Sequence, residues 1–270
     1  MQNNKHLIIG LGAMLLTSLV SAHDNLHEFS VGDHRSQKNI ARNDSRHPIE
    51  TLNFFGIRNT MTVVELSPGG GWYTEILAPY LKEKGQYIAA GYDSESKINY
   101  YQVNAKRLID KLAADPKNYG RVKLTVMEAP HKLDFAEKNS ADLVLSFRNT
   151  HNWARSGHAE KVFSAVYDVV KPGGFFGLVQ HRAGHNIPKD TSGELGYMKQ
   201  SDVIKMAESV GFKLVAKSEI NANSRDVKNY KDGVWTLPPS YGLKDKDRAL
   251  YTSIGESDRM TLKFAKPAME

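Results

Sequence analysis

The stretch from Val63 to Tyr73 constrains the fold of this chain more than any other. A short β-branched run ends at Glu65, passes through three consecutive glycines, Gly69 to Gly71, and enters an amphipathic segment, Trp72 to Leu81. This order predicts a strand, a tight turn and a helix N-terminus, where a backbone without Cβ atoms can approach a ligand closely. A plain strand-to-helix turn that binds nothing would have the same pattern, so the rest of the chain must decide between the two.

Short apolar runs alternate with helical periodicity along most of the chain. The expected strands lie at 62–66, 87–90, 122–127, 143–147, 175–179, 212–220 and 260–264. The expected helices lie at 48–55, 72–81, 96–114, 158–170 and 201–211. Such alternation predicts an α/β fold with a doubly wound, mostly parallel sheet and helices on both faces. Ligands of these sheets bind at the carboxyl ends of the strands.

Two later segments add to the glycine loop. Asp142 leads a buried strand, and Lys171-Pro172-Gly173-Gly174 opens another apolar run. In this order the three features resemble the class I S-adenosylmethionine-dependent methyltransferases, from about Ile49 to Lys266. The first loop of that family usually reads acid-x-Gly-x-Gly-x-Gly, and Ser67 replaces its first glycine here. The resemblance implies a Rossmann-like sheet of about seven strands, with an antiparallel last strand beside the fifth.

The resemblance also implies a binding site for S-adenosylmethionine. The residues assigned to it are Glu65, Ser67, Gly69, Gly70, Gly71, Asp93, Glu128 and Arg148. Glu65 would accept a hydrogen bond from the ammonium group of the cofactor, or else orient the turn. The ribose-binding acid of the family falls on Gly91, so Asp93, two residues later, would bind the ribose or cap the next helix. Glu128 follows the third strand, where the family contacts the adenine amino group.

The polar cluster from Arg148 to Trp153 directly follows the fourth strand, where the family places catalytic or substrate-holding residues. We assign catalytic roles to Asn149, His151 and His181. A histidine titrates near neutrality and can act as a general base, which is the role expected of His151. Trp153 would form a wall of the methyl site, unless the cluster is only a hydrogen-bonded loop with a buried tryptophan. His181 and His185 are four residues apart, but Gly184 disfavours a helix presenting both, so no metal site is expected.

Residues 1–22 have the pattern of a signal peptide. Lys5 precedes the apolar stretch Leu7–Val20, which is short for a membrane span, and Ser21 and Ala22 supply small residues for cleavage. We therefore expect an exported, periplasmic protein with no stable membrane span after removal of this leader. An uncleaved anchor or a buried helix is the alternative. The chain has no cysteine, which excludes lipoprotein acylation and disulfides.

Three further parts complete the expected organisation. Residues 23–48 would form a polar arm, and 49–270 one α/β domain with an irregular insertion at 221–258. A loop of that length tends to be functional, although it could equally cover an edge of the sheet. The formal net charge of +6 is scattered, without an arginine stripe interleaved with aromatics, so no nucleic-acid partner is expected.

The leading hypothesis for function is transfer of a methyl group from S-adenosylmethionine to a small-molecule nucleophile. An exported methyltransferase-like fold that only binds a small molecule is the second, because the cofactor is made in the cytoplasm and because Gly91 replaces the ribose-binding acid. A nicotinamide-dependent oxidoreductase is the third, since a related glycine loop binds dinucleotides. The absence of a G-x-G-x-x-G motif and the Lys171–Gly174 turn count against it. The sequence does not indicate the oligomeric state.

Overall fold

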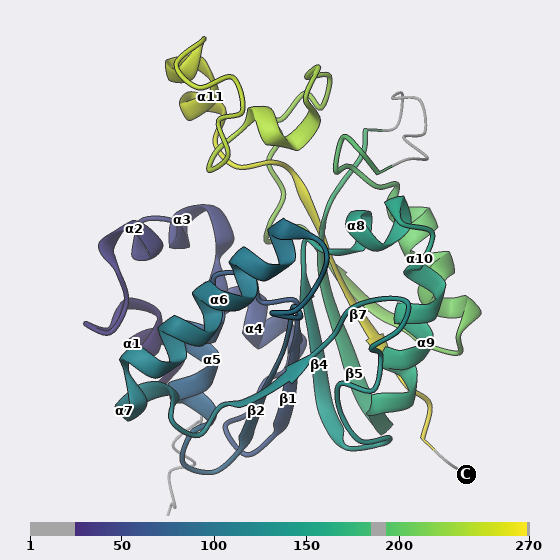
Figure 1. Cartoon of the computed structure of the whole chain (residues 1–270). Helices are drawn as coiled ribbons and strands as arrows, with labels where there is room; N and C mark the ends of the chain where they lie inside the picture. Colours follow the sequence, from purple (N-terminus) through teal and green to yellow (C-terminus); the bar gives the residue numbers. More distant parts are fainter. Residues whose placement is uncertain (1–24, 185–192, 269–270) are drawn as a thin grey trace, which may run out of the picture.

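The computed structural model describes residues 25–184 and 193–268, which form a seven-stranded sheet with helices on both faces (Figure 1). The expected leader and His185 lie outside the described residues. The strands are β1 (Thr62–Leu66), β2 (Gln86–Gly91), β3 (Lys123–Val126), β4 (Ala141–Phe147), β5 (Val170–His181), β6 (Lys213–Ser218) and β7 (Arg259–Ala265). Their order in the sheet is β3-β2-β1-β4-β5-β7-β6. β1 to β5 pair in parallel, and β7 is antiparallel to both β5 and β6. The predicted fold class is confirmed, including the antiparallel strand beside the fifth.

The helices form two layers. α4 (Pro48–Phe55), α5 (Thr74–Leu81), α6 (Asn99–Ala114) and α7 (Pro116–Tyr119) cover one face, whereas α8 (Thr150–Arg155), α9 (Ala159–Val169) and α10 (Gln200–Ser209) cover the other. Successive residues of β1 show how both faces are buried, because Val63 packs in one core cluster and Val64 in the other. A strand buried on both faces is expected to be mostly apolar, and β1 is apolar at Val63, Val64 and Leu66.

β5 begins five residues earlier than the apolar run predicts. Val170 already pairs with Ala141, and after a register shift Phe175 pairs with Leu143. The Lys-Pro-Gly-Gly turn therefore lies inside the strand as a bulge. At the same end of the sheet Lys171 Nζ forms an ion pair of 2.7 Å with Asp142. The Lys-Pro-Gly-Gly turn and the acid at the start of β4 thus organise the sheet rather than the ligand site.

The N-terminal region folds against the domain instead of extending from it. It contains α1 (Asn25–Val31), α2 (Gln37–Ile40) and α3 (Asn43–Arg46), and α1 packs on α5. Leu26 is fully buried in the core. Helices of four residues are too short to show a 3.6-residue period, which is why the sequence alone suggested only a polar arm.

The insertion between β6 and β7 lies at the same end of the sheet as α2 and α3 (Figure 1). It contains a 3-10 helix, η1 (Gly233–Thr236), and α11 (Arg248–Ile254). In Figure 1 the insertion stands over the upper end of the sheet, and α2 and α3 lie beside that same end. Within the described ranges, no helix has the length and apolar character that crossing a membrane requires.

Candidate functional site

A cavity of about 910 Å³ opens at the carboxyl ends of β1, β2, β4 and β5. Its walls come from the glycine loop, the start of α6, the segment after β4, the α2–α3 region and the insertion. This volume is at the upper end of the range for small-molecule sites. Of the predicted site residues, those lining it are Glu65, Ser67, Gly69, Gly70, Arg148, Asn149, His151 and His181. Gly71, Asp93 and Glu128 do not line it.

The glycines of the first loop have different roles. A Cβ atom added to Gly69 or Gly70 would meet nothing within 4 Å, so both leave open space at the cavity wall. A Cβ on Gly71 would instead lie 3.1 Å from Lys111 and 3.3 Å from Leu108, which belong to α6. The missing side chain of Gly71 therefore allows α6 to pack closely against the loop.

The backbone angle at Ser67 explains why the methyltransferase family usually has glycine at this position. Its φ angle is +46°, in the left-handed region where only glycine has no steric cost. Gly69, with φ of +59°, continues the same turn. The chain thus keeps the loop conformation although it has lost one glycine.

Glu65 is an ionisable group that the fold buries at the floor of the cavity, with 2 % of its surface exposed. Burial raises its pKa to about 7, against the hydrogen bonds from Tyr87 and Thr74 and the nearby charges of Arg148 and Arg46. Both hydrogen bonds go to Oε2. Among the described residues Oε1 has no hydrogen-bond partner, so it is available to a cationic group.

The end of β2 differs from the predicted ribose site. A Cβ atom on Gly91 would lie 3.3 Å from Leu108, so that position faces α6 and not the cavity. Asp93 pairs with Lys132 and accepts a hydrogen bond from the amide of Glu95 in a local turn; it does not cap α6, which begins at Asn99 without a side-chain cap. The bond from Lys132 lowers the pKa of Asp93 below its usual value.

Tyrosines form the cavity wall beyond β2. Tyr92 lines the cavity and stacks on Tyr101, with ring centroids 4.4 Å apart and ring planes within 9°. Tyr100 and Asn104 line the same region. Glu128 accepts a hydrogen bond from Ser96 Oγ at 3.0 Å and stands outside this wall. The tyrosine wall was missed in the sequence, where only the spacing of Tyr92 from the Tyr100–Tyr101 pair indicates it.

The polar cluster after β4 divides between the cavity and the core. Asn149 donates from Nδ2 to the carbonyl of Leu66 at 3.0 Å, which joins the ends of β4 and β1. Trp153 instead packs against Phe163 in the core, with ring centroids 6.5 Å apart, so it is not a wall of the methyl site. The tryptophans that do line the cavity are Trp72, next to the glycine loop, and Trp235 of the insertion.

His151 and His181 lie next to each other at the cavity, with ring centroids 5.6 Å apart. The amide of Gln180 is 3.2 Å from His151 Nδ1, and Ser257 Oγ is 2.5 Å from His181 Nδ1. Burial and the charges of His151 and Arg148 lower the pKa of His181 well below its usual value, so its imidazole is neutral. Within the ranges that the structure describes, no group of three His, Cys, Asp or Glu side chains is arranged to hold a metal ion.

An ion-pair cluster joins the N-terminal helices to the end of the insertion. The carboxylate of Glu256 pairs with Arg42 at 2.7 Å, Arg46 at 3.3 Å and Arg259 at 3.1 Å. Burial alone would raise the pKa of Glu256, but these guanidinium groups and Arg148 lower it to about 2. Arg42, Arg46 and Glu256 line the cavity. Their contribution was missed because the partners come from segments without a motif, more than 200 residues apart.

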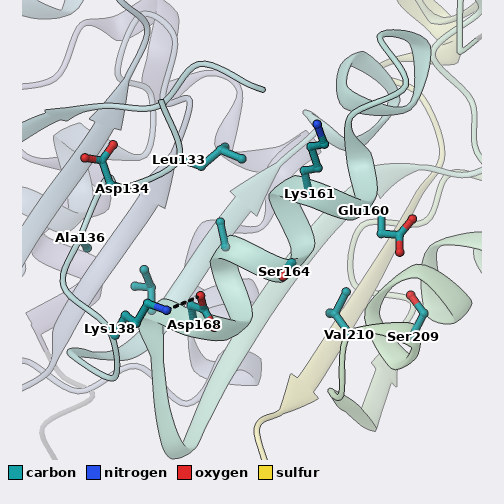
Figure 2. Close-up of a pocket in the computed structure, with 12 residues that line it drawn as sticks. Leu133, Asp134, Ala136, Lys138, Glu160, Lys161, Ser164, Asp168, Ser209 and Val210 are labelled. Atoms are coloured by element: carbon teal, nitrogen blue, oxygen red, sulfur yellow. Dashed lines mark ion pairs between the residues drawn. The ribbon is translucent and has the colours of Figure 1, made fainter. Parts of the chain in front are cut away.

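A second hollow of about 930 Å³ lies along the outer side of α9 (Figure 2). Lys138 and Asp168 form an ion pair of 3.1 Å there, and both side chains are at least half exposed. Asp134, Glu160 and Lys161 complete its charged lining. None of the predicted site residues is in this hollow, so the cavity at the strand ends is the candidate functional site.

Comparisons with known proteins agree with this placement. Residues 64–178 match the family model described as a methyltransferase domain, a range that includes the glycine loop, β4 and much of β5. An S-adenosylmethionine-dependent methyltransferase from Aquifex aeolicus is similar in structure, with a TM-score of 0.52, 15 % identity, and coverage of 74 % of this chain and 93 % of that one. No curated protein matches the chain in sequence.

Two other solved structures share the fold. The 4+2 cyclase SpnF has a TM-score of 0.58 and 14 % identity, over 88 % of this chain and 86 % of that one. Phosphoethanolamine N-methyltransferase 2 of Haemonchus contortus has a TM-score of 0.55 and 16 % identity, over 90 % of this chain and 56 % of that one. The latter structure holds phosphomonomethylethanolamine and S-adenosylhomocysteine.

Residues 64–178 thus match a methyltransferase domain, and the seven-stranded sheet has the fold of the S-adenosylmethionine-dependent methyltransferase structure that it resembles. S-adenosylmethionine is the cofactor that this domain indicates. The residues of the cavity fit that cofactor, because Gly69 and Gly70 leave room against the backbone and Glu65 Oε1 is available to an ammonium group.

Proposed function

We propose that the chain transfers a methyl group from S-adenosylmethionine to a small-molecule nucleophile bound in the 910 Å³ cavity. S-adenosylmethionine supplies an electrophilic methyl group when it is bound. The observation that carries the proposal is the position of Glu65, Gly69 and Gly70 on one side of a cavity whose other side holds Asn149, His151 and His181. The cavity is large enough for a drug-sized cofactor together with a small acceptor.

The residues of β1 and its loop would hold the cofactor. Gly69 and Gly70 provide close backbone approach, and Glu65 accepts a hydrogen bond from the ammonium group. Tyr92 and Tyr101 offer a stacked aromatic wall near the end of β2. This wall would take the place of the ribose-binding acid, by packing rather than by a carboxylate.

The two histidines would handle the proton of the acceptor. A nucleophilic hydroxyl or amine must lose a proton during methyl transfer, and a nearby base supplies about a hundredfold or more in rate. Gln180 and Trp235 hold the ring of His151, so it is a positioned base at the cavity. His181, neutral and hydrogen-bonded to Ser257, would orient the acceptor.

Calorimetric titration of the purified protein tests the proposal. We expect S-adenosylmethionine and S-adenosylhomocysteine to bind and NAD not to bind. With an acceptor in hand, His151→Ala should lower turnover about a hundredfold or more with little change in cofactor affinity. Full turnover in that variant would reduce His151 to a structural residue and make His181 the next candidate base.

A second candidate is a protein of this fold that binds a small molecule without transferring a methyl group. Two observations favour it: Gly91 faces α6 where the family has its ribose-binding acid, and a similar solved structure is described as a cyclase. It predicts binding of a small molecule with no dependence on S-adenosylmethionine. Titrations with small molecules, in the presence and absence of S-adenosylhomocysteine, distinguish the two candidates. Binding of a small molecule by a protein that does not bind S-adenosylhomocysteine would favour the second.

We also propose that the chain is exported, on the strength of the leader pattern in residues 1–22. An exported methyltransferase needs S-adenosylmethionine outside the cytoplasm. The location of the chain is tested by N-terminal sequencing, and its activity is tested separately by the titrations described above.

A further inference from the structure

We infer that the methyl acceptor carries an anionic group, a carboxylate or a phosphate, which Arg148 binds together with Arg42 and Arg46. This inference rests on the proposed function, since it names the class of molecule that shares the cavity with the cofactor. It comes from the charges around the cavity, which the described side chains leave unbalanced.

Arg148 is the residue that indicates a missing anion. It follows β4 directly, with its amide bonded to the carbonyl of Val179, and its side chain reaches the cavity wall. Within the described ranges its guanidinium group makes no hydrogen bond and no ion pair. Burial and the charges of Arg259 and Arg42, against that of Glu256, lower its pKa to about 10. Arg148 is partly exposed at the cavity wall, so its unpaired guanidinium group is accessible to an incoming anion, which its planar donors can bind in a bidentate way.

Glu256 cannot serve as the partner of Arg148, because its carboxylate is already occupied. Oε1 accepts from Arg42 Nε at 2.8 Å, while Oε2 accepts from Arg46 Nε at 3.3 Å and from Arg259 Nη1 at 3.1 Å. Four guanidinium charges therefore surround one carboxylate. Arg46 Nη1, moreover, is buried without a hydrogen-bond partner. The cluster holds its arginines in place and retains unused donors for a second anion.

The cofactor adds no net negative charge to the cavity. S-adenosylmethionine carries one carboxylate, one ammonium and one sulfonium group, so its net charge is positive, and binding it increases the positive charge of the cavity. Its ammonium group is matched by Glu65 in our assignment. A negative charge on the acceptor would balance both the arginines and the sulfonium, which also favours bringing the two reactants together.

The position of the arginines agrees with a role in holding the acceptor. The charges of Arg148, Arg259 and Arg46 act on His181, so these groups are close to the histidine pair. Trp235 and Pro238 line the same cavity and offer an apolar surface for the rest of the acceptor. An anionic group fixed at the arginines would therefore lie next to the bases that serve the nucleophile.

Titration with small probe anions tests the inference before any acceptor is known. The probes are benzoate and phenyl phosphate, with benzamide and benzyl alcohol as neutral controls, in the presence and absence of S-adenosylhomocysteine. We expect at least one anion to bind ten times more tightly than its neutral control, and more weakly as NaCl is raised. Arg148→Gln should weaken that anion tenfold or more, whereas Arg148→Lys should retain part of the affinity.

Two further variants control for a general effect of charge and for misfolding of Arg148→Gln. Arg121→Gln removes the same charge from an exposed position far from the cavity lining, so it should leave every affinity unchanged. Arg42→Gln, at a more exposed arginine of the same cluster, replaces Arg148→Gln if that variant does not fold. Melting curves of all variants establish folding before the titrations.

The results that would overturn the inference are specific. Equal binding of anionic and neutral probes, or an anion preference that survives both Arg148→Gln and Arg42→Gln, would remove the anion site. A loss of affinity for S-adenosylhomocysteine in Arg148→Gln, with unchanged affinity for methylthioadenosine, which lacks the amino-acid part, would assign Arg148 to the cofactor carboxylate instead. A wild-type protein that binds no S-adenosylhomocysteine would defeat the proposed function, while the anion titration of the same protein still decides the charge of the ligand.

Discussion

Glu65 is a carboxyl group that the fold buries before any ligand arrives, and its raised pKa has a consequence for stability. A folded-state pKa of about 7 lies above the ordinary value of 4.5, so the folded protein holds this proton more tightly than the unfolded chain. The associated stability is complete below pH 4.5 and is lost as the pH rises through 7, a difference of about 3 kcal/mol. We expect Glu65→Gln, a neutral substitute, to raise the melting temperature of the ligand-free protein at pH 8 but hardly at pH 4.

The same substitution should have the opposite effect on ligand binding. Glu65→Gln removes the charge that attracts the ammonium group, so S-adenosylhomocysteine should bind at least tenfold more weakly at pH 8. In the wild type the affinity should fall about tenfold per pH unit below 7, as Glu65 takes up its proton. Calorimetric titrations between pH 5.5 and 8 measure both effects. An affinity that is independent of pH in the wild type would place the ammonium group elsewhere.

Two adjacent glycines provide a matched pair for the cofactor loop. A side chain at Gly70 would enter open cavity, and its φ angle is not left-handed, so Gly70→Val should fold normally and weaken S-adenosylhomocysteine binding at least tenfold. A side chain at Gly71 would press on Lys111 and Leu108 from a φ of +76°. Gly71→Val should therefore lower the melting temperature by several degrees, through strain and overpacking of about 1–3 kcal/mol each.

The measurements for this pair are a melting curve and a calorimetric titration of each variant. Normal affinity in a well-folded Gly70→Val protein would move the cofactor away from this part of the loop. A Gly71→Val protein as stable as the wild type would show that α6 is not packed against the loop as described.

At the scale of elements, Glu256 connects the N-terminal helices to the start of β7. The guanidinium groups around it hold its pKa at about 2, below the ordinary 4.5. The stability that this carboxylate contributes is present above pH 4.5 and is lost as the pH falls through 2. We expect Glu256→Gln to destabilise the protein at pH 7 by about 3 kcal/mol, because Arg42, Arg46 and Arg259 then lose their shared partner. The difference from wild type should shrink towards pH 2.

Glu219 is the control for this experiment. It also pairs with an arginine, Arg182, at 2.6 Å, but its side chain is 67 % exposed. An exposed ion pair contributes little, so Glu219→Gln should leave the melting temperature almost unchanged at pH 7. Equal effects of the two substitutions would mean that the cluster around Glu256 does not hold α3 against the end of the insertion.

The elements that the sequence predicted well are those with a strong internal period. Val63–Leu66 and Leu143–Phe147 are apolar runs interrupted only by Glu65 and Ser146, and such runs are typical of strands buried on both faces. The helix at 158–170 carried its apolar residues on one face and is confirmed as α9. The short helices α2 and α3 have no such period. They are held by contacts with distant residues, Asn39 of α2 with Glu75 and Arg46 of α3 with Glu256.

The site was predicted only in part, for a related reason. Residues at the ends of parallel strands, such as Glu65, Asn149 and His181, meet at one edge of the sheet by topology. The direction of a single Cβ atom cannot be read from such a pattern, so the sequence did not indicate that α6 packs against Gly71 or that Asp93 pairs with Lys132.

At the scale of the whole molecule, two segments far apart in sequence cover the cavity. The N-terminal segment is anchored through Glu75 of α5, which pairs with Arg35 at 3.1 Å and with Lys111, and accepts from Asn39 Nδ2 at 2.8 Å. Trp72 donates to the carbonyl of Asn39 at 3.1 Å. The segment that precedes the methyltransferase domain is therefore part of the folded unit, and the boundary of that unit bears on export.

The hypothesis that residues 1–22 are a cleaved leader can be tested against the start of the folded unit at α1. Leu26 is fully buried and α1 packs on α5, so cleavage after Ala22 would leave every described contact intact. We expect protein from the cell envelope to begin at or near His23, and a purified chain that begins at His23 to melt at the same temperature as the envelope protein. A chain that begins at Gly32 lacks α1 and should be less stable by at least 2–5 kcal/mol, about the cost of emptying one buried leucine site. N-terminal sequencing and melting curves measure these outcomes, and recovery of a chain with intact Met1 from the cytosol would show that the leader does not direct export.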